Sequence, residues 1–412
     1  MIYLSIFIYL LFLSIHYDIL ENKKYKWIHF KIVITLLILV AGLRWRIGAD
    51  TVLYAHEFVY SHDLFHLELS DFESMGRMPF WVLLYAVCKT IWNDFLLVQF
   101  VIAAFTITVS GYFVKKVCPS LCFFILLCYY IGGRYSSLHL ELLREAMAVS
   151  FYLLGILAVN ERKNKRALLF YLCAVMFHVF AIIAILIFVF CYYLLPKNSL
   201  LRLFFCFALL FIVLFDNDFI VSIIEKNIGI LIVNEEVVLK ILGYTTGDKY
   251  GNTEKSIVNY MWLILQFLSY IFMLYKIDGI YSKSVLMKRD LFDVGVFICV
   301  VLLCIKYSFL IVYRIGGNYN YFFTCLLSVV FTKELLLAKV KYAQRIFVYI
   351  ILLIIPLFFC FKLYLNEDYV YENNRWYFRY YPYSSVFDKS LNYDRERLHQ
   401  FRGSGYSKNT DY

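Results

Sequence analysis

The chain has 412 residues, of which 62% are hydrophobic and 17% are charged. A soluble globular domain is about 45–50% apolar and about 25% charged, so this composition excludes a soluble enzyme, a secreted disulfide scaffold and a disordered chain. The mean hydropathy is +0.71, and only five prolines interrupt the apolar stretches. Because a helix needs about 20 apolar residues to cross a membrane, we expect an all-α, polytopic integral membrane protein with about 10–12 transmembrane helices.

The net charge of +10 comes from 40 Lys and Arg residues against 30 Asp and Glu residues. In a membrane protein this excess first reports orientation, because Lys and Arg concentrate in cytoplasmic loops. We therefore expect no nucleic-acid partner. The 11 cysteines lie almost entirely inside apolar segments, without a CxxC spacing, and we interpret them as small core residues.

The first apolar segments set the orientation. Met1–Leu20 is predicted to be an uncleaved span with its N-terminus outside, because a Lys-rich segment follows it. Trp27–Trp45 returns to the outside, and Phe95–Val114 then runs to a Lys pair on the inside. Between them, Pro79–Trp92 provides only about 14 residues, or about 21 Å of helix. That is too short to cross, so we expect a re-entrant or interfacial helix on the outer side.

The next segments contain a predicted break. Leu121–Ile131 goes out, and Leu142–Val159 comes back to a strongly basic inner loop. The apolar run Ala167–Leu195 has basic residues at both ends, which favours an inner position for both. We therefore expect this run to fold back near Phe177-His178 as two short helices.

The remaining spans follow a long outer loop. We expect one transmembrane domain over residues 1–365, with outer loops 44–78 and 216–255, and an extracytoplasmic tail over 366–412. The long loop holds a possible amphipathic segment, Phe219–Leu242. The later predicted spans are Leu200–Phe215, Ser256–Tyr275, Leu291–Val312, Tyr319–Phe331 and Phe347–Leu365.

Basic residues differ between the two sides of this topology. The inner loops are rich in Lys, which is a topological signal, whereas the short outer loops carry Arg. Arg presents a fork that binds phosphate bidentately, so the pattern favours an outward-facing site for an anionic ligand. The alternative is contact with lipid headgroups or pairing with nearby Asp and Glu. The outer residues are Arg44, Arg46, Arg77, Arg134, Arg144 and Arg314.

Three of these arginines stand in polar stretches at the outer ends of spans. Arg44 and Arg46 precede Asp50 where the second span ends, and ionisable groups at that depth are usually functional. The alternative there is an Arg46–Asp50 ion pair that caps the span. Arg144 begins a later span beside Glu141 and Glu145, where the alternative is a Glu141–Arg144 ion pair worth only tenths of a kcal/mol.

Two further stretches hold candidate site residues. His178, at the predicted fold-back, is a candidate acid, base or ligand binder, or else a hydrogen bonder between packed helices. Tyr313–Tyr321 is expected to be a tight outer turn between two spans, and its paired glycines would let the backbone approach a ligand closely. Its Arg314 and Tyr319 would then reach the same cavity as Arg44; the alternative is a plain turn with an aromatic belt.

Metal and nucleotide signatures are weak or absent in the sequence. His62-x-x-x-His66 matches a helical zinc pair by spacing, but no HExxH occurs. No P-loop, Walker-type or dinucleotide motif is present. We therefore expect no metal and no cofactor.

Taken in order, several motifs resemble those of the EpsG/Wzy family of bacterial polysaccharide repeat-unit polymerases. Arg77-Met78 replaces the acidic residue that the family has before Pro79, and Glu145 replaces a Gln. The stretches span nearly the whole chain: Gly42-Leu43-Arg44-x-Arg46-x-Gly48-x-Asp50-x3-Tyr54, Met78-Pro79-Phe80-Trp81, Leu143-Arg144-Glu145-Ala146-Met147-Ala148, Phe177-His178 and Tyr381-Pro382-Tyr383-Ser384-Ser385-Val386-Phe387.

The resemblance implies a glycosyltransferase of the bacterial inner membrane with its active site facing the periplasm or outside. A growing glycan would pass from undecaprenyl diphosphate to the non-reducing end of an incoming lipid-linked repeat unit. His178 and Asp50 are the candidate general bases. Membrane lipids and a chain-length regulator protein are expected partners. The expected diphosphate or substrate site comprises Arg44, Arg46, Tyr54, Arg77, Arg144, Arg314 and Tyr319.

Two alternative functions remain open from the sequence. A lipid-linked glycan ligase, or another polyprenyl-phosphate-dependent glycosyltransferase, would share the outer Arg set but use a different acceptor. A lipid-linked oligosaccharide flippase or transporter would usually show internal repeats and charges at the midplane. We see no clear repeat, and Lys306 is the buried charge that favours transport.

Overall fold

The computed structural model describes residues 2–74, 77–194, 199–215, 257–275, 285–305, 310–333, 341–366 and 375–402. Over these residues the regular elements are helices, and the bridge residues Arg44, Arg375 and Ser385 include one β-bridge, between Arg44 and Ser385. The all-α prediction is therefore confirmed for this part of the chain. The chain forms two compact units, Met1–Ala181 with Lys283–Leu286 and Leu336–Tyr412, and Ile182–Ser282 with Met287–Leu335.

Within the described ranges, three helices are long and apolar enough to cross a membrane, and all three belong to the first unit. They are Ile2–Ile19, comprising α1 (Ile2–Leu13) and η1 (Ser14–Ile19), then α6 (Phe95–Val117) and α9 (Leu143–Asn160). A bent pair, Pro119–Ile131 and Arg134–Glu141, passes the same test with an angle of 73° between its halves. Long apolar runs predicted these helices to within a few residues, but not the bend.

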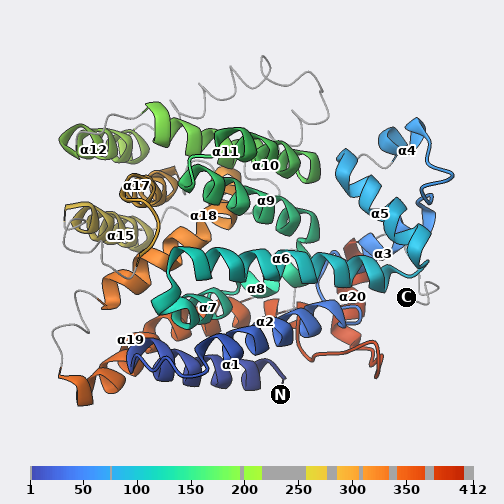
Figure 1. The fold of residues 1–412 in the computed structure, drawn as a ribbon, viewed down its shortest axis with the longest axis horizontal. Coiled ribbons are helices and arrows are strands. Elements are labelled where there is room, and N and C mark those ends of the chain that lie inside the picture. Colours follow the sequence, from blue (N-terminus) through green and yellow to red (C-terminus); the bar gives the residue numbers. More distant parts are fainter. Residues whose placement is uncertain are drawn as a thin grey trace. The chain divides into compact units, whose positions relative to one another are not determined.

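The helices of the first unit pack against partners that are distant in the sequence. Helix α6 contacts both α2 (Lys26–Gly42) and α9, which in turn packs along α10 (Asn164–Phe177) (Figure 1). Helix α1 packs against α7 (Cys122–Ile131), and α19 (Tyr342–Leu365) contacts α7 as well. The unit is therefore a helical bundle in which α19, near the end of the chain, packs beside α7 from its first third.

A buried ion pair ties three of these helices together. Lys26 Nζ lies 2.7 Å from Asp18 Oδ1 and also donates to the carbonyl oxygen of Ser120. The second carboxylate oxygen of Asp18 accepts the backbone N–H of Phe124 at 2.8 Å. Such a pair is tolerated in the interior because its remaining donors and acceptors are satisfied.

Three short helices follow α2. They are α3 (Thr51–Tyr60), α4 (Leu69–Ser74) and α5 (Pro79–Ile91), and α5 begins with proline at its first position, where no N–H is needed. The predicted short apolar helix is thus present. Lys89 of α5 donates to the carbonyl oxygens of Phe58, Val59 and Ser61 at the end of α3, which orders the α3–α5 contact.

The chain after α19 is an integral part of the first unit. The tail contains η7 (Trp376–Arg379) and α20 (Tyr393–Arg402). Its backbone bonds to the turn after α2, where Ser384 accepts from Trp45 at 2.9 Å and Val386 donates to Leu43 at 3.0 Å. These bonds build one wall of the candidate site.

The second unit contains the remaining described helices. Helix α17 packs against α12, α15 and α18. Its first turn is anchored by Arg289, whose Nε donates to Asp293 at 2.7 Å. The bounds are α11 (Ala181–Val189), η4 (Phe190–Leu194), α12 (Ser199–Phe215), α15 (Ile257–Tyr275), α17 (Arg289–Ile305) and α18 (Leu310–Phe331).

The structure corrects the predicted tight turn at Tyr313–Tyr321. Helix α18 runs without interruption through Gly316 and Gly317. A Cβ atom on Gly316 would lie 2.3 Å from a Leu302 methyl carbon of α17. Glycine here permits two helices to pack closely, which is its common use in membrane helices, rather than reversing the chain.

Other predictions lie beyond the described residues. The long outer loop 216–255, its amphipathic segment Phe219–Leu242, and Lys306 fall outside these ranges. The predicted break near His178 is present, because α10 ends at Phe177 and α11 begins at Ala181.

The tail helix is expected to lose stability in mild acid. His399 of α20 is 6% exposed and its Nε2 donates to the carbonyl oxygen of Arg46 at 3.2 Å. Burial lowers the pKa of His399 to about 4, whereas an unfolded histidine titrates near 6.5. Docking should therefore be most stable above about pH 6.5 and weaken as the pH falls towards about 4, by on the order of 3 kcal/mol.

Amide hydrogen exchange over residues 393–402, corrected for intrinsic rates, measures this effect. We expect protection to fall between pH 7.5 and pH 5 in the wild type. In His399→Gln, which keeps a neutral polar group but does not titrate, protection should change much less. Equal pH dependence in both proteins would contradict the prediction.

Candidate functional site

The turn after α2 is ordered by Arg44. This side chain is completely buried, its Nε donates to the carbonyl oxygen of Ile47 at 3.2 Å, and Nη1 donates to that of Ala41. Gln99 of α6 bonds the carbonyl oxygens of Gly42 and Arg44 from the other side. The guanidinium of Arg44 therefore stabilises the turn that carries Arg46 and Gly48.

Gly48 lets this turn approach the end of the bent helix pair. Its φ is +95°, and a Cβ atom there would lie 1.8 Å from the carbonyl oxygen of Leu140. Thr51 Oγ1 donates to the same carbonyl oxygen at 3.3 Å. Only glycine satisfies both the backbone conformation and this close contact, so the turn and the segment before Arg144 are held together.

Arg46 pairs with the tail. Its Nε and Nη2 lie 2.9 Å and 2.5 Å from the two carboxylate oxygens of Glu396 in α20. This bidentate geometry replaces the Arg46–Asp50 pair that the sequence offered as an alternative. Arg46 is thus engaged across 350 residues of sequence, in the same contact region as His399.

Glu141 is held by two tail residues. Arg379 Nη1 and the Tyr380 hydroxyl each lie 2.6 Å from one of its carboxylate oxygens. The side chains of Arg379 and Glu141 are only 1% and 7% exposed. The carboxylate of Glu141 is therefore used to dock the tail, rather than to neutralise Arg144 as the sequence alternative proposed.

One face of α3 gathers the candidate site residues. Asp50, Tyr54 and Glu57 follow one another at spacings of four and three residues, which places them on one side of the helix. Arg77, just before α5, forms a bidentate ion pair with Glu57. The guanidinium of Arg144 stands over the ring of Tyr54, with its carbon 5.8 Å from the ring centroid.

The Tyr54 hydroxyl stays protonated in this setting. Burial raises its pKa to about 12, although the nearby Arg144 opposes the shift. An arginine side chain can only donate hydrogen bonds, so the neighbouring Arg144 cannot take up the proton of this hydroxyl. Tyr54 and Arg144 together can therefore donate several hydrogen bonds to one anion.

Arg144 differs from three other arginines of this region. Arg46, Arg77 and Arg379 each form an ion pair with a carboxylate, whereas no ion pair of Arg144 is found within the part of the chain that the structure describes. Its Nε is buried and has no hydrogen-bond partner among those residues. The site therefore presents a positive charge that is not neutralised by a carboxylate ion pair, at the second residue of α9.

Helix α5 supplies an aromatic wall behind Tyr54. Trp81 is fully buried, with its ring 5.2 Å from Tyr54 and 4.8 Å from Tyr85. The Tyr85 hydroxyl donates to the backbone carbonyl of Tyr54 at 3.0 Å. Sequence reasoning recognised the Trp81 motif but missed its role in fixing Tyr54, and it also missed Glu57 as the partner of Arg77.

His178 lies at the edge of this arrangement. It follows the last residue of α10, and its backbone N–H bonds to Ala174 at 3.0 Å. The preceding Phe177 packs against Phe80 at a centroid distance of 5.6 Å, and Phe80 is the residue before Trp81. His178 therefore belongs to the same unit as Arg144 and stands near the start of α5.

Two predicted site residues belong to the second unit. Tyr319 is fully buried in α18. Arg314 is on the same helix, but its side chain is outside what the structure describes. Their predicted proximity to Arg44 stays a prediction.

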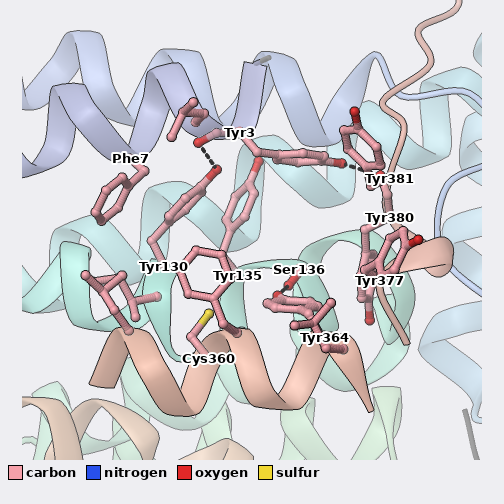
Figure 2. Close-up of a pocket in the computed structure, with 15 residues that line it drawn as sticks. Tyr3, Phe7, Tyr130, Tyr135, Ser136, Cys360, Tyr364, Tyr377, Tyr380 and Tyr381 are labelled. Carbon is pink, nitrogen blue, oxygen red and sulfur yellow. Dashed lines mark hydrogen bonds between the residues drawn. The ribbon is translucent and has the colours of Figure 1, made fainter. Parts of the chain in front are cut away.

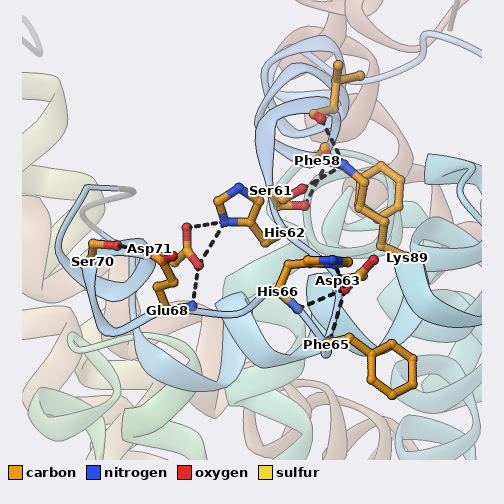
Figure 3. Close-up of polar contacts among 11 residues, drawn as sticks. Phe58, Ser61, His62, Asp63, Phe65, His66, Glu68, Ser70, Asp71 and Lys89 are labelled. Carbon is orange, nitrogen blue, oxygen red and sulfur yellow. Dashed lines mark hydrogen bonds and ion pairs between the residues drawn. The ribbon is translucent and has the colours of Figure 1, made fainter.

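The histidines near α4 point to separate partners (Figure 3). His62 Nδ1 lies 2.9 Å from Asp71, and His66 Nδ1 lies 2.8 Å from Asp63. The hydrogen bond from His66 holds the pKa of Asp63 below its usual value. These bonds order the loop between α3 and α5, and the two imidazoles do not converge on a shared metal position.

Comparison with known proteins gives one family. The family model described as the EpsG family matches residues 27–385. The matched range runs from α2 to the tail residue that bridges Arg44, and it includes Tyr54, Arg77, Arg144 and Glu141. No curated protein and no solved structure matches the chain.

The Glu141–Arg379 pair should be essential for folding. Arg379→Met leaves the buried carboxylate of Glu141 without its cation, and breaking such a pair typically costs about 3–5 kcal/mol. We expect a markedly lower thermal unfolding midpoint for the purified protein in detergent. Arg397→Met, at an exposed position on α20, is the control and should unfold close to the wild type. Unfolding of Arg379→Met at the wild-type temperature would contradict this role.

Proposed function

The chain belongs to the EpsG family, and from this premise we propose that it is a membrane glycosyltransferase that polymerises polysaccharide repeat units. It transfers a growing glycan from undecaprenyl diphosphate to the non-reducing end of an incoming lipid-linked repeat. The observation that carries the proposal is Arg144, a cation without a carboxylate partner among the described residues, beside the protonated Tyr54 hydroxyl.

The apolar helices support a place in the bacterial inner membrane. Three described helices and one bent pair have the length and composition of membrane spans. We propose a polytopic domain over residues 1–365 with about 10–12 crossings. The site lies at the ends of α2, α6 and α9 that the charge pattern places outside, and the described tail segment, residues 375–402, docks there. We propose that the whole tail, 366–412, is extracytoplasmic.

The leaving group explains the requirement for Arg144. When the bond between the anomeric carbon and the diphosphate oxygen breaks, negative charge develops on the diphosphate. Donors fixed in advance at that position stabilise the transition state more than the ground state. Arg144 provides a fork of N–H groups, Tyr54 provides an O–H group, and the ion pair Arg77–Glu57 holds the neighbouring wall.

The acceptor hydroxyl must lose a proton as its oxygen bonds to the anomeric carbon. Asp50 is the better placed candidate base, because it lies close enough to Tyr54 for its charge to act on that hydroxyl. His178 is the second candidate, near the start of α5. The proton then resides on the base, and the electron pair of the broken bond leaves with the diphosphate.

A hollow beside α3 suits the glycan. Its volume is about 660 Å³, and its lining combines aromatic rings with polar side chains, including Trp45, Phe58, Trp92 and Asn93. Trp92 is 51% exposed, and the indole N–H of Trp45 is buried without a partner among the described residues. Amphipathic aromatic rings beside hydrogen-bond donors match the alternating faces of a sugar.

Membrane lipids and a chain-length regulator protein are further proposed partners.

Arg144→Ala should abolish polymer formation. Removing a fixed donor from a developing oxyanion costs about 10²–10³ in kcat, and Tyr54→Phe should cost less because Arg144 remains. The measurement is transfer by the purified protein with a lipid-diphosphate oligosaccharide, alongside the polysaccharide ladder in a polymerase-null host. Arg397→Ala at matched membrane levels is the control. Wild-type transfer by Arg144→Ala would refute this assignment, and transfer to a different acceptor would favour a ligase.

Trp92→Ala should weaken glycan binding without disturbing the chemistry. An aromatic contact of this kind contributes about 1 kcal/mol, so we expect KM for the oligosaccharide acceptor to rise about fivefold with kcat nearly unchanged. Trp27→Ala on α2 is the control, since Trp27 is also exposed but does not line the hollow. An unchanged KM, or an equal effect in both variants, would speak against a glycan site here.

A further inference from the structure

The first unit contains a second cavity, of about 640 Å³, whose walls come from α1, α7, α8 (Arg134–Ser136), α19 and η7 (Figure 2). Tyrosine is its commonest lining residue, yet its interior is almost entirely carbon. The interior is apolar although tyrosines line it, because several of their hydroxyl groups hydrogen-bond to the protein outside the cavity.

At one end the tyrosine hydroxyls are bound to the protein. Tyr130 donates to the carbonyl oxygen of Tyr3, and Tyr3 donates to that of Tyr380, both at 3.0 Å. Tyr135 donates to the carbonyl oxygen of Leu37 at 2.8 Å. The rings therefore turn their carbon faces to the cavity.

The middle of the cavity is equally closed to polar ligands. The hydroxyls of Tyr364 and Ser136 hydrogen-bond to each other at 2.5 Å, and at the end nearer the tail the Tyr380 hydroxyl donates a hydrogen bond to Glu141. Phe7 and Cys360 add apolar surface to the lining. A charged or polar group placed here would lose its water without finding a partner, at a cost of several kcal/mol. The interior can accept only an apolar chain.

The end of the cavity at the tail has the opposite character. The hydroxyls of Tyr377 and Tyr381 have no hydrogen-bond partner in the described part of the chain, and Tyr381 is 52% exposed. Arg375 is exposed and donates to the carbonyl oxygen of Leu365, a lining residue. Lys362 is exposed in the last turn of α19. This mouth has two tyrosine hydroxyl donors and the cation of Lys362 near it, so the cavity is shaped for an amphiphile with an anionic head.

The mouth adjoins the candidate site through Tyr380. This residue lines the cavity, and its hydroxyl binds Glu141, which stands three residues before Arg144. A head group at this mouth is therefore on the same side of the unit as the unneutralised Arg144, while its chain extends between α1 and α19.

We propose that this cavity holds the isoprenoid chain of the lipid-diphosphate donor, with the head group at the end formed by Tyr377 and Tyr381. The assignment rests on the proposed polymerase function and adds the place where the lipid is recognised. Its chemistry is an apolar chain against aromatic carbon faces, with the charged head excluded from the interior.

Photolabelling of the full-length protein in phospholipid nanodiscs tests the proposal. The two probes are a diazirine-bearing polyprenyl diphosphate and a diazirine-bearing phosphatidylglycerol, and labelled peptides are mapped by mass spectrometry. Cys360→Phe fills the cavity. Ile354→Phe, on α19 at an exposed position that does not line the cavity, is the matched control.

We expect the polyprenyl probe to label residues 130–136 and 357–365, and Cys360→Phe to reduce this labelling about tenfold, while Ile354→Phe leaves it unchanged. Equal labelling of these peptides by both probes, or polyprenyl labelling elsewhere, would overturn the chain site. At a saturating concentration of the probe, Arg144→Ala should still be labelled on these same peptides but should lose transfer. Intact labelling in a wild-type protein that forms no polymer would contradict the polymerase function instead.

Discussion

The contact of Glu141 with Arg379 and Tyr380 is the constraint on which the outer end of this protein depends. A carboxylate buried in this position is acceptable only because a guanidinium and a phenol bind its two oxygens. The same contact fixes the tail, whose backbone then pairs with the turn that carries Arg44 and Arg46. Arg46, through Glu396, and His399 extend this region along α20. The described part of the tail therefore forms a wall of the site and is not a separate appendage.

This arrangement separates two uses of arginine. Arg46, Arg77 and Arg379 are neutralised by carboxylates and hold the framework, and Arg44 orders its own turn through backbone carbonyls. Arg144 stands among them beside a hydroxyl instead of a carboxylate. Because Arg46, Arg77 and Arg379 are already paired with carboxylates, an anionic ligand would gain the most favourable electrostatic interaction at Arg144. The proposed diphosphate site follows from that difference in pairing.

The sequence predicted much of the fold, because long apolar runs and basic flanks specify helices whose partners need not be known. It also picked out Asp50, Tyr54, Arg77 and Arg144, which the structure gathers around α3. Pairing across hundreds of residues, such as Arg379 with Glu141, left no local signal, so the alternatives that the sequence offered were the nearby pairs Arg46–Asp50 and Glu141–Arg144. The stretch around Gly316-Gly317 was predicted to be a tight turn with close backbone approach to a ligand, whereas it is helical and Gly316 packs against Leu302 of α17.

Direct binding of the leaving group tests the central role of Arg144. The dissociation constant of undecaprenyl diphosphate would be compared with that of undecaprenyl monophosphate, for the wild type and for Arg144→Ala. A bidentate charged contact that is lost on substitution should weaken diphosphate binding by at least about tenfold, and monophosphate binding by less. Equal affinities for the diphosphate in both proteins would show that Arg144 does not bind it, and the site would have to be sought elsewhere.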